Sequence, residues 1–76
     1  MTLPEFVQQF TSALDIDGVT VDAETQFKQM PTWDSLCVLN VIAMVDEAYG
    51  LTLTAQHIED ASTVADLCAT IERIRA

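Results

Sequence analysis

Apolar residues recur every three to four positions in three segments of the chain, which is the spacing of amphipathic helices. The first segment opens with a capping-box pattern at Thr2 to Glu5 that has proline in its first turn, and it predicts a helix over residues 3–14. The second predicts a helix from about 34 to 49, ended by Gly50. The third follows a capping box at Thr63 to Asp66 and predicts a last helix with arginines at its end.

The segments between these helices are polar and differ in length. Residues 15–31 form a long loop, and we expect Val21 and Phe27 to attach it to the core. Thr54 can cap a short helix over about residues 55–59 that buries Ile58. The pattern predicts an all-α fold, a four-helix bundle with a long loop between helices one and two and a short third helix. Its expected core residues are Phe6, Phe10, Val41, Val45, Leu67 and Ile71.

The second helix has two apolar faces, because residues 36–45 contain one polar side chain, Asn40. A helix in a bundle of this size cannot bury its whole circumference. We expect one stripe to face the core, namely Val38, Val41, Ile42, Val45 and Tyr49. The other consists of Leu36, Leu39 and Ala43, and it is predicted to lie partly exposed as a docking surface. Tighter burial or a homodimer would also explain it.

Composition limits the class of protein. The chain has 76 residues, of which half are hydrophobic, so we expect a single domain over residues 1–76 with one small core. Two glycines and two prolines argue against an all-β chain with many turns. Twelve acidic and three basic residues give a net charge of −9. Such a surface repels nucleic acid and anionic membranes and favours partners with basic patches, and we expect the chain to be a monomer.

The remaining features favour a cytoplasmic protein. The first residues lack the basic and apolar regions of a signal peptide, and no apolar run is long enough to span a bilayer. Cys37 and Cys68 lack metal-ligand spacing and accompany a single histidine. We therefore expect two reduced thiols and no metal site.

Ser35 is the main candidate for chemistry. Asp34 is a natural N-cap, which places Ser35 in the first helical turn with its hydroxyl in solvent. A phosphodiester on that oxygen would lie near the positive end of the helix dipole. Ser35 is a poor catalytic nucleophile, because the one histidine, His57, lies in the third-helix region without a supporting acid. The position suits phosphorylation or a phosphate-linked prosthetic group; an unmodified first-turn serine is the plain alternative.

Several motifs together resemble the acyl carrier protein family, the phosphopantetheine-bearing carriers. They are Asp34-Ser35-Leu36, the helix that ends in Asp46-Glu47-Ala48-Tyr49-Gly50, Leu51-Thr52-Leu53-Thr54 followed by Ile58, and Thr63-Val64 followed by Leu67 and Ile71. With tryptophan at position 33, directly before this motif, the chain resembles discrete carriers from specialised pathways. Many family members have glycine three positions before the serine, where this chain has Thr32.

The resemblance implies a function. A phosphopantetheinyl transferase would move 4'-phosphopantetheine from coenzyme A to the Ser35 hydroxyl, with Asp34 assisting the modification. The thiol of this arm would carry acyl groups as thioesters for lipid, polyketide or other specialised biosynthesis, and the carrier itself would catalyse nothing. Its partners would be the transferase and the acyl-loading and condensing enzymes, which dock through basic or apolar patches.

The resemblance also marks the docking surface. Fatty-acid carriers have acidic residues in the first half of the second helix, where this chain has Cys37 and Asn40. Docking would therefore rest more on Leu36, Leu39 and Ala43, with Asn40 on the same surface. Asp46 and Glu47 would supply the remaining charge. An aminoacyl or peptidyl carrier shares the attachment site and is one alternative function. An unmodified carrier-like interaction module is the other.

Overall fold

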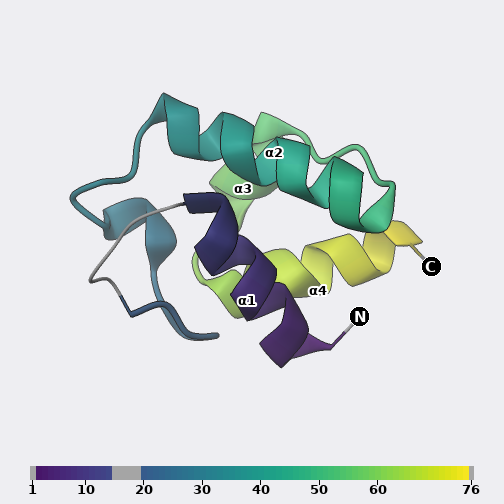
Figure 1. Cartoon of the computed structure of the whole chain (residues 1–76), viewed down its shortest axis with the longest axis horizontal. Helices are drawn as coiled ribbons and strands as arrows, with labels where there is room; N and C mark the ends of the chain where they lie inside the picture. Colours follow the sequence, from purple (N-terminus) through teal and green to yellow (C-terminus); the bar gives the residue numbers. More distant parts are fainter. Residues whose placement is uncertain (1, 15–19, 76) are drawn as a thin grey trace.

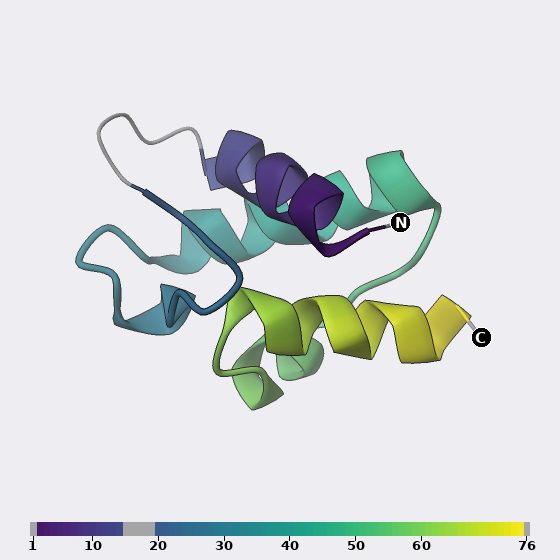
Figure 2. The same cartoon turned by 90° about the horizontal axis from the view of Figure 1, so that it is seen from below.

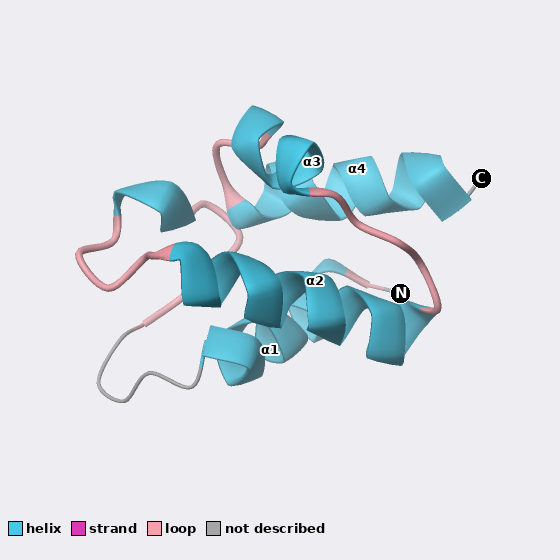
Figure 3. Cartoon of the chain, turned by 90° about the horizontal axis from the view of Figure 1, so that it is seen from above, coloured by secondary structure: helices cyan, strands magenta, loops and turns pink. Residues whose placement is uncertain are grey.

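The computed structural model describes residues 2–14 and 20–75 and contains helices but no strand in those ranges (Figure 3). The all-α prediction is confirmed. The elements are α1 Leu3–Leu14, the 3-10 helix η1 Phe27–Gln29, α2 Ser35–Tyr49, α3 Ala55–Asp60 and α4 Val64–Arg75. The four predicted helices begin and end within a residue or two of these bounds, whereas η1 was not predicted. Within the described ranges, no helix has the length and apolarity needed to cross a membrane.

The helices form two pairs around one core (Figures 1 and 2). Helix α1 packs on α2 and α4, and the short α3 contacts α2 and α4. In Figure 2, α1 and α2 lie on one side and α3 and α4 on the other. In both views the segment with η1 lies at the end of the bundle where α2 begins. Ser35 therefore lies at the junction between this segment and the bundle.

Among residues 2–14 and 20–75, fifteen apolar residues form the core. The six predicted core residues are all fully buried, so that prediction is confirmed. Phe10 is central to an aromatic cluster, because its ring lies 6.1 Å from that of Phe6, 5.3 Å from that of Phe27 and 6.3 Å from that of Trp33. Since α1, η1 and the residues before α2 all contribute rings, this cluster connects the long loop to the bundle.

The core-facing side of α2 differs in part from the prediction. Val41 and Val45 are buried as expected, but Cys37 and Met44 are buried with them. Val38, Ile42 and Tyr49 pack only partly against the core. Neighbouring residues on a helix lie about 100° apart around its axis, so Cys37 and Val38 lie at opposite edges of the apolar side of α2. The rotation of α2 about its own axis therefore decides which of the two side chains is buried. Contact with α1 determines which of the two edges is covered.

Local capping hydrogen bonds set the helix ends. The Thr63 hydroxyl accepts from Asp66 N at 3.1 Å, and an Asp66 carboxylate oxygen accepts from Thr63 N at 3.1 Å, which confirms the predicted box. Thr54 caps α3, and His57 Nδ1 accepts from Thr54 N at 3.1 Å. The His57 side chain is therefore the second member of this capping box. Gly50 has φ +66°, a left-handed conformation that favours glycine.

Backbone hydrogen bonds attach the long loop to the second helix pair. Val64 N donates to Thr25 O at 3.2 Å and Ala65 N donates to Ala23 O at 2.8 Å, so the loop caps the start of α4. Lys28 Nζ donates to Glu59 O at the end of α3. Phe27 is fully buried and Val21 is partly buried, which confirms their predicted anchoring role. The loop that leads to Ser35 is therefore held at several points.

We predict that Tyr49→Phe will leave the fold intact and stabilise it by about 1 kcal/mol. The Tyr49 hydroxyl is buried and has no hydrogen-bond partner among the described residues, while its ring packs 6.3 Å from that of Phe6. Burial raises the pKa of Tyr49, and the Glu5 carboxylate raises it further. Urea unfolding followed by circular dichroism measures the effect. A lower midpoint than that of the parent would show that the hydroxyl makes a stabilising contact.

Candidate functional site

Ser35 is the first residue of α2 and is exposed to solvent. Asp34 precedes it in an extended conformation, and Asp34 Oδ1 accepts from Cys37 N at 3.0 Å. The predicted N-cap is therefore confirmed. The cap turns the chain from loop to helix at Ser35, which presents the Ser35 side chain at the helix end.

The Asp34 carboxylate is favoured in its charged form. Its hydrogen bond from the Cys37 backbone holds the pKa of Asp34 below the ordinary value of 3.8. A depressed pKa means that the cap contributes stability above the pKa of the unfolded chain and loses it as the pH falls through the lower folded value. The cap next to Ser35 is thus fully ionised at neutral pH.

The start of α2 fits a phosphate-linked group. The first intrahelical hydrogen bond runs from Val38 N to Asp34 O at 3.2 Å, so the N–H groups of Ser35 and Leu36 precede the helical ladder. These donors and the positive end of the helix dipole favour an anion on the neighbouring Ser35 oxygen. A phosphodiester at this oxygen would be stabilised by the helix end, and its solvent exposure leaves room for a long substituent.

Trp33 and Cys37, which flank Ser35 in the sequence, attach the chain on both sides of it to the rest of the protein. The half-buried Trp33 ring lies nearly parallel to that of Phe10, at 8°, and edge-on to that of Phe27 at 5.0 Å. These contacts make Trp33 an anchor that attaches the end of the loop to the core. The Cys37 thiol is buried and donates to Thr32 O at 3.5 Å. Although Cys37 follows Ser35 by only two residues, its buried thiol faces the core and does not belong to the exposed surface of α2.

An exposed apolar strip runs along α2 from Ser35. Leu36 is 63% exposed and Leu39 is 62% exposed, and Ala43 is also exposed. The predicted second face is therefore confirmed as a solvent-exposed surface. Asn40 is half-buried at its edge and Glu47 is exposed farther along.

A groove between α1 and α2 borders this strip, and sequence reasoning missed it. Its volume is about 680 Å³. Asn40, Ala43 and Glu47 line it from α2, and Gln9, Ser12 and Ala13 line it from α1. The repeat of small residues on α1 and α2 was the available signal, but it indicates a groove only once the two helices are known to face each other.

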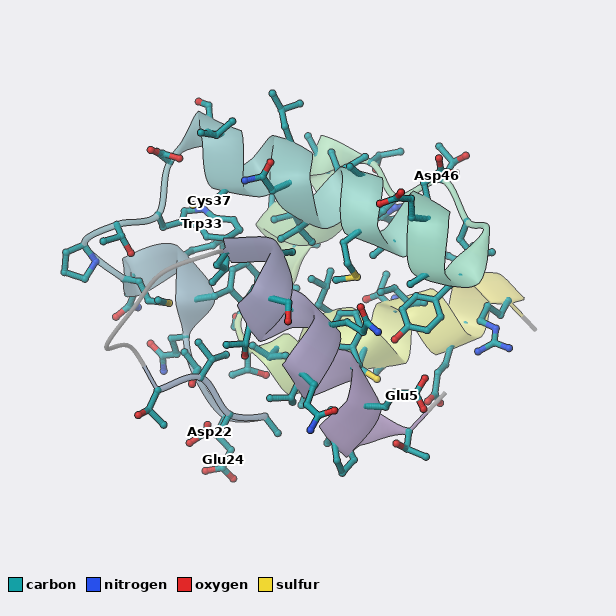
Figure 4. All side chains as sticks on the ribbon, viewed as in Figure 1. Glu5, Asp22, Glu24, Trp33, Cys37 and Asp46 are labelled. Carbon is teal, nitrogen blue, oxygen red and sulfur yellow. The ribbon has the colours of Figure 1, made fainter. Side chains whose placement is uncertain are left out.

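The histidine and the acidic residues of the long loop lie apart from Ser35. His57 is engaged in the cap of α3 through its Nδ1 atom. Asp22 and Glu24 lie on the loop at the opposite edge of the molecule from α2 (Figure 4). The side chains in residues 2–14 and 20–75 include no group of three or more that could hold a metal ion. The features that fit a phosphate-linked group thus concentrate at the start of α2.

Comparison with known proteins gives one result. A family model described as the phosphopantetheine attachment site matches residues 5–71. No curated protein and no solved structure matches the chain. The matched region covers most of the sequence and includes the Asp34-Ser35-Leu36 motif, and the chain therefore belongs to the phosphopantetheine attachment site family, whose members bind 4'-phosphopantetheine.

Proposed function

We propose that this phosphopantetheine carrier is an acyl carrier protein, with the arm attached to Ser35 and acyl intermediates held on the arm as thioesters. The supporting observation is the exposed Ser35 at the N-terminus of α2, behind its Asp34 cap and inside the family match. A flexible arm on a stable bundle raises the effective concentration of its cargo at a partner's active site. The carrier contributes position, and its partner enzymes contribute catalysis.

In the proposed modification this chain supplies the Ser35 oxygen as the nucleophile, and the neighbouring Asp34 carboxylate assists the transfer. The bond from Ser35 Oγ to the phosphorus of the pantetheine phosphate forms while the phosphoanhydride bond of coenzyme A breaks. The adenosine 3',5'-bisphosphate leaves, and a base of the transferase takes the hydroxyl proton. The histidine of this chain is occupied in the α3 cap, which supports a transferase rather than self-modification.

We predict that Ser35→Ala abolishes modification. Coexpression with a broad-specificity phosphopantetheinyl transferase should add the mass of one phosphopantetheine to the parent and nothing to Ser35→Ala. Ser62→Ala is the matched control, because Ser62 is also exposed and lies just before a helix, α4. Intact-protein mass spectrometry measures all three. An arm that persists in Ser35→Ala would refute the assignment, and an unmodified parent would favour the interaction module.

The cargo separates an acyl carrier from an aminoacyl or peptidyl carrier. Both would use the same serine and arm. Hydroxylamine cleaves a thioester to release the cargo as a hydroxamate. For an acyl carrier the hydroxamate isolated from the loaded native protein should lack an α-amino group, whereas an α-amino acid or peptide hydroxamate would assign the chain to the alternative class.

We predict that Leu39→Ser slows docking without unfolding the protein. Burial of an exposed leucine against a partner is worth about 1.5–3 kcal/mol, so the transferase should modify Leu39→Ser about tenfold more slowly. Ile74→Ser is the control, because Ile74 is also exposed, at 39%, but lies on α4. Raising salt to physiological strength should slow modification less, since it screens charges rather than apolar contacts. Strong salt sensitivity with an unaffected Leu39→Ser would contradict an apolar docking surface.

A further inference from the structure

Cys37 follows Ser35 by two residues and lies on the opposite side of α2. Successive residues of a helix are rotated by about 100°, so side chains two positions apart point in nearly opposite directions. Cys37 is 6% exposed and belongs to the core, whereas Ser35 is exposed. Leu39 lies on the same side as Ser35, because four residues make little more than one turn. A rotation of α2 that buries Cys37 therefore turns Ser35 and Leu39 toward solvent.

Cys37 also holds the segment Thr32–Asp34, which leads into Ser35. Its backbone N–H donates to Asp34 Oδ1 at 3.0 Å, and its thiol donates to Thr32 O at 3.5 Å. Among the described residues, no backbone N–H group donates to Thr32 O, so this carbonyl depends on the thiol for its hydrogen bond within the described protein. A single residue of the first turn of α2 thus binds both ends of the segment before Ser35.

The ionisation of Asp34 is a second sign that the Cys37 side chain faces this segment. The hydrogen bond from the Cys37 backbone is the main cause of the lowered pKa of Asp34, and the Cys37 side chain is the next. Hydrogen bonds to the charged form of a carboxyl group lower its pKa, because they favour that form. The thiol therefore lies next to two acceptors, the Thr32 carbonyl and the Asp34 carboxylate, which flank Trp33 in the chain.

We propose that Cys37 is a positioning residue for the modification of Ser35 and acts through the hydrogen bond of its buried thiol. The thiol holds Thr32–Asp34 in one conformation, so the Ser35 oxygen keeps one place relative to the exposed leucines, Leu36 and Leu39. A transferase that docks on these leucines then meets the nucleophile in a fixed position, which reduces the entropy lost on reaching the reactive geometry. This proposal rests on the proposed function, because it takes Ser35 as the attachment site.

Three variants separate the hydrogen bond of the thiol from its packing. Cys37→Ala removes the donor, whereas Cys37→Ser replaces the thiol with a hydroxyl that can donate to Thr32 O. Cys68→Ala is the matched control, because Cys68 is also buried, at 4% exposure, but lies on α4. The measurement is kcat and KM for the modification of each purified protein by a broad-specificity phosphopantetheinyl transferase with coenzyme A. Circular dichroism and urea unfolding report the fold and stability of each variant.

The expected result separates positioning from docking and from stability. Cys37→Ala should lower kcat about fivefold with KM near that of the parent, because the docking leucines are unchanged while Ser35 is held less firmly. Cys37→Ser should restore kcat, and Cys68→Ala should leave both constants near those of the parent although it also loses packing. If Cys37→Ala does not fold, Cys37→Val keeps an apolar side chain without a donor and should show the same loss of kcat.

The contrary results distinguish this proposal from the carrier function. A modified parent with the same kcat in Cys37→Ala and Cys68→Ala, or with equal losses in Cys37→Ala and Cys37→Ser, would overturn the positioning role and leave the carrier function standing. A rise in KM without a change in kcat would also overturn it, because the effect would then lie in docking. A parent that gains no arm would refute the carrier function, and the positioning role would fall with it.

Discussion

Replacement of Phe10 with alanine should destabilise the protein by about 3–5 kcal/mol, the largest effect that we expect from one substitution. Phe10 is fully buried, and its ring contacts those of Phe6, Phe27 and Trp33. Small proteins unfold at a cost of about 5–15 kcal/mol in total, so the variant should lose much of its stability. The substitution removes packing from α1, from η1 and from the residues before Ser35 together.

Two spectroscopic probes can follow the unfolding of Phe10→Ala. Trp33 is the one tryptophan in the chain, so its fluorescence reports the aromatic cluster, while circular dichroism reports the helices. We expect the urea midpoint to fall by both probes. If Phe10→Ala unfolds completely, Phe10→Leu should fold with an intermediate loss of stability. A Phe10→Ala midpoint equal to that of the parent would contradict the observed cluster.

Leu67→Ala should destabilise the protein by about 2–5 kcal/mol, as expected for a buried leucine that leaves a cavity. Leu67 is fully buried on α4. Ile74→Ala is the control on the same helix, since Ile74 is 39% exposed and should cost far less. Urea unfolding of both variants tests the packing of α4. Equal, small effects at the two positions would show that α4 is not packed through Leu67.

The helices could be predicted because their determinants are local. Apolar spacing identified α1, α2 and α4, and capping residues located their starts at Thr63 and Asp34. The attachment of the loop could not be predicted in the same way. Its main contacts run from backbone N–H groups of α4 to the carbonyls of Ala23 and Thr25, and any residue except proline supplies such groups.

In the candidate site, too, the features with local determinants could be predicted and those that depend on packing could not. The place of Ser35 at a capped helix start follows from its neighbours in sequence, and so does the exposure of Leu36 and Leu39. The direction of Cys37 does not, because both edges of α2 are apolar and contact with α1 decides which edge is buried. The groove depends on residues of α1 and α2 that are far apart in the chain, so only the packed structure brings them together.

The most direct test of the central claim locates the attached group on the chain. After incubation with the transferase and coenzyme A, trypsin should release a peptide from Gln29 to Arg73, since no lysine or arginine lies between these ends. Fragmentation of this peptide by tandem mass spectrometry should place one phosphopantetheine on Ser35. A group located on Ser62 or on any other residue of the peptide, or a peptide of unchanged mass, would contradict the account.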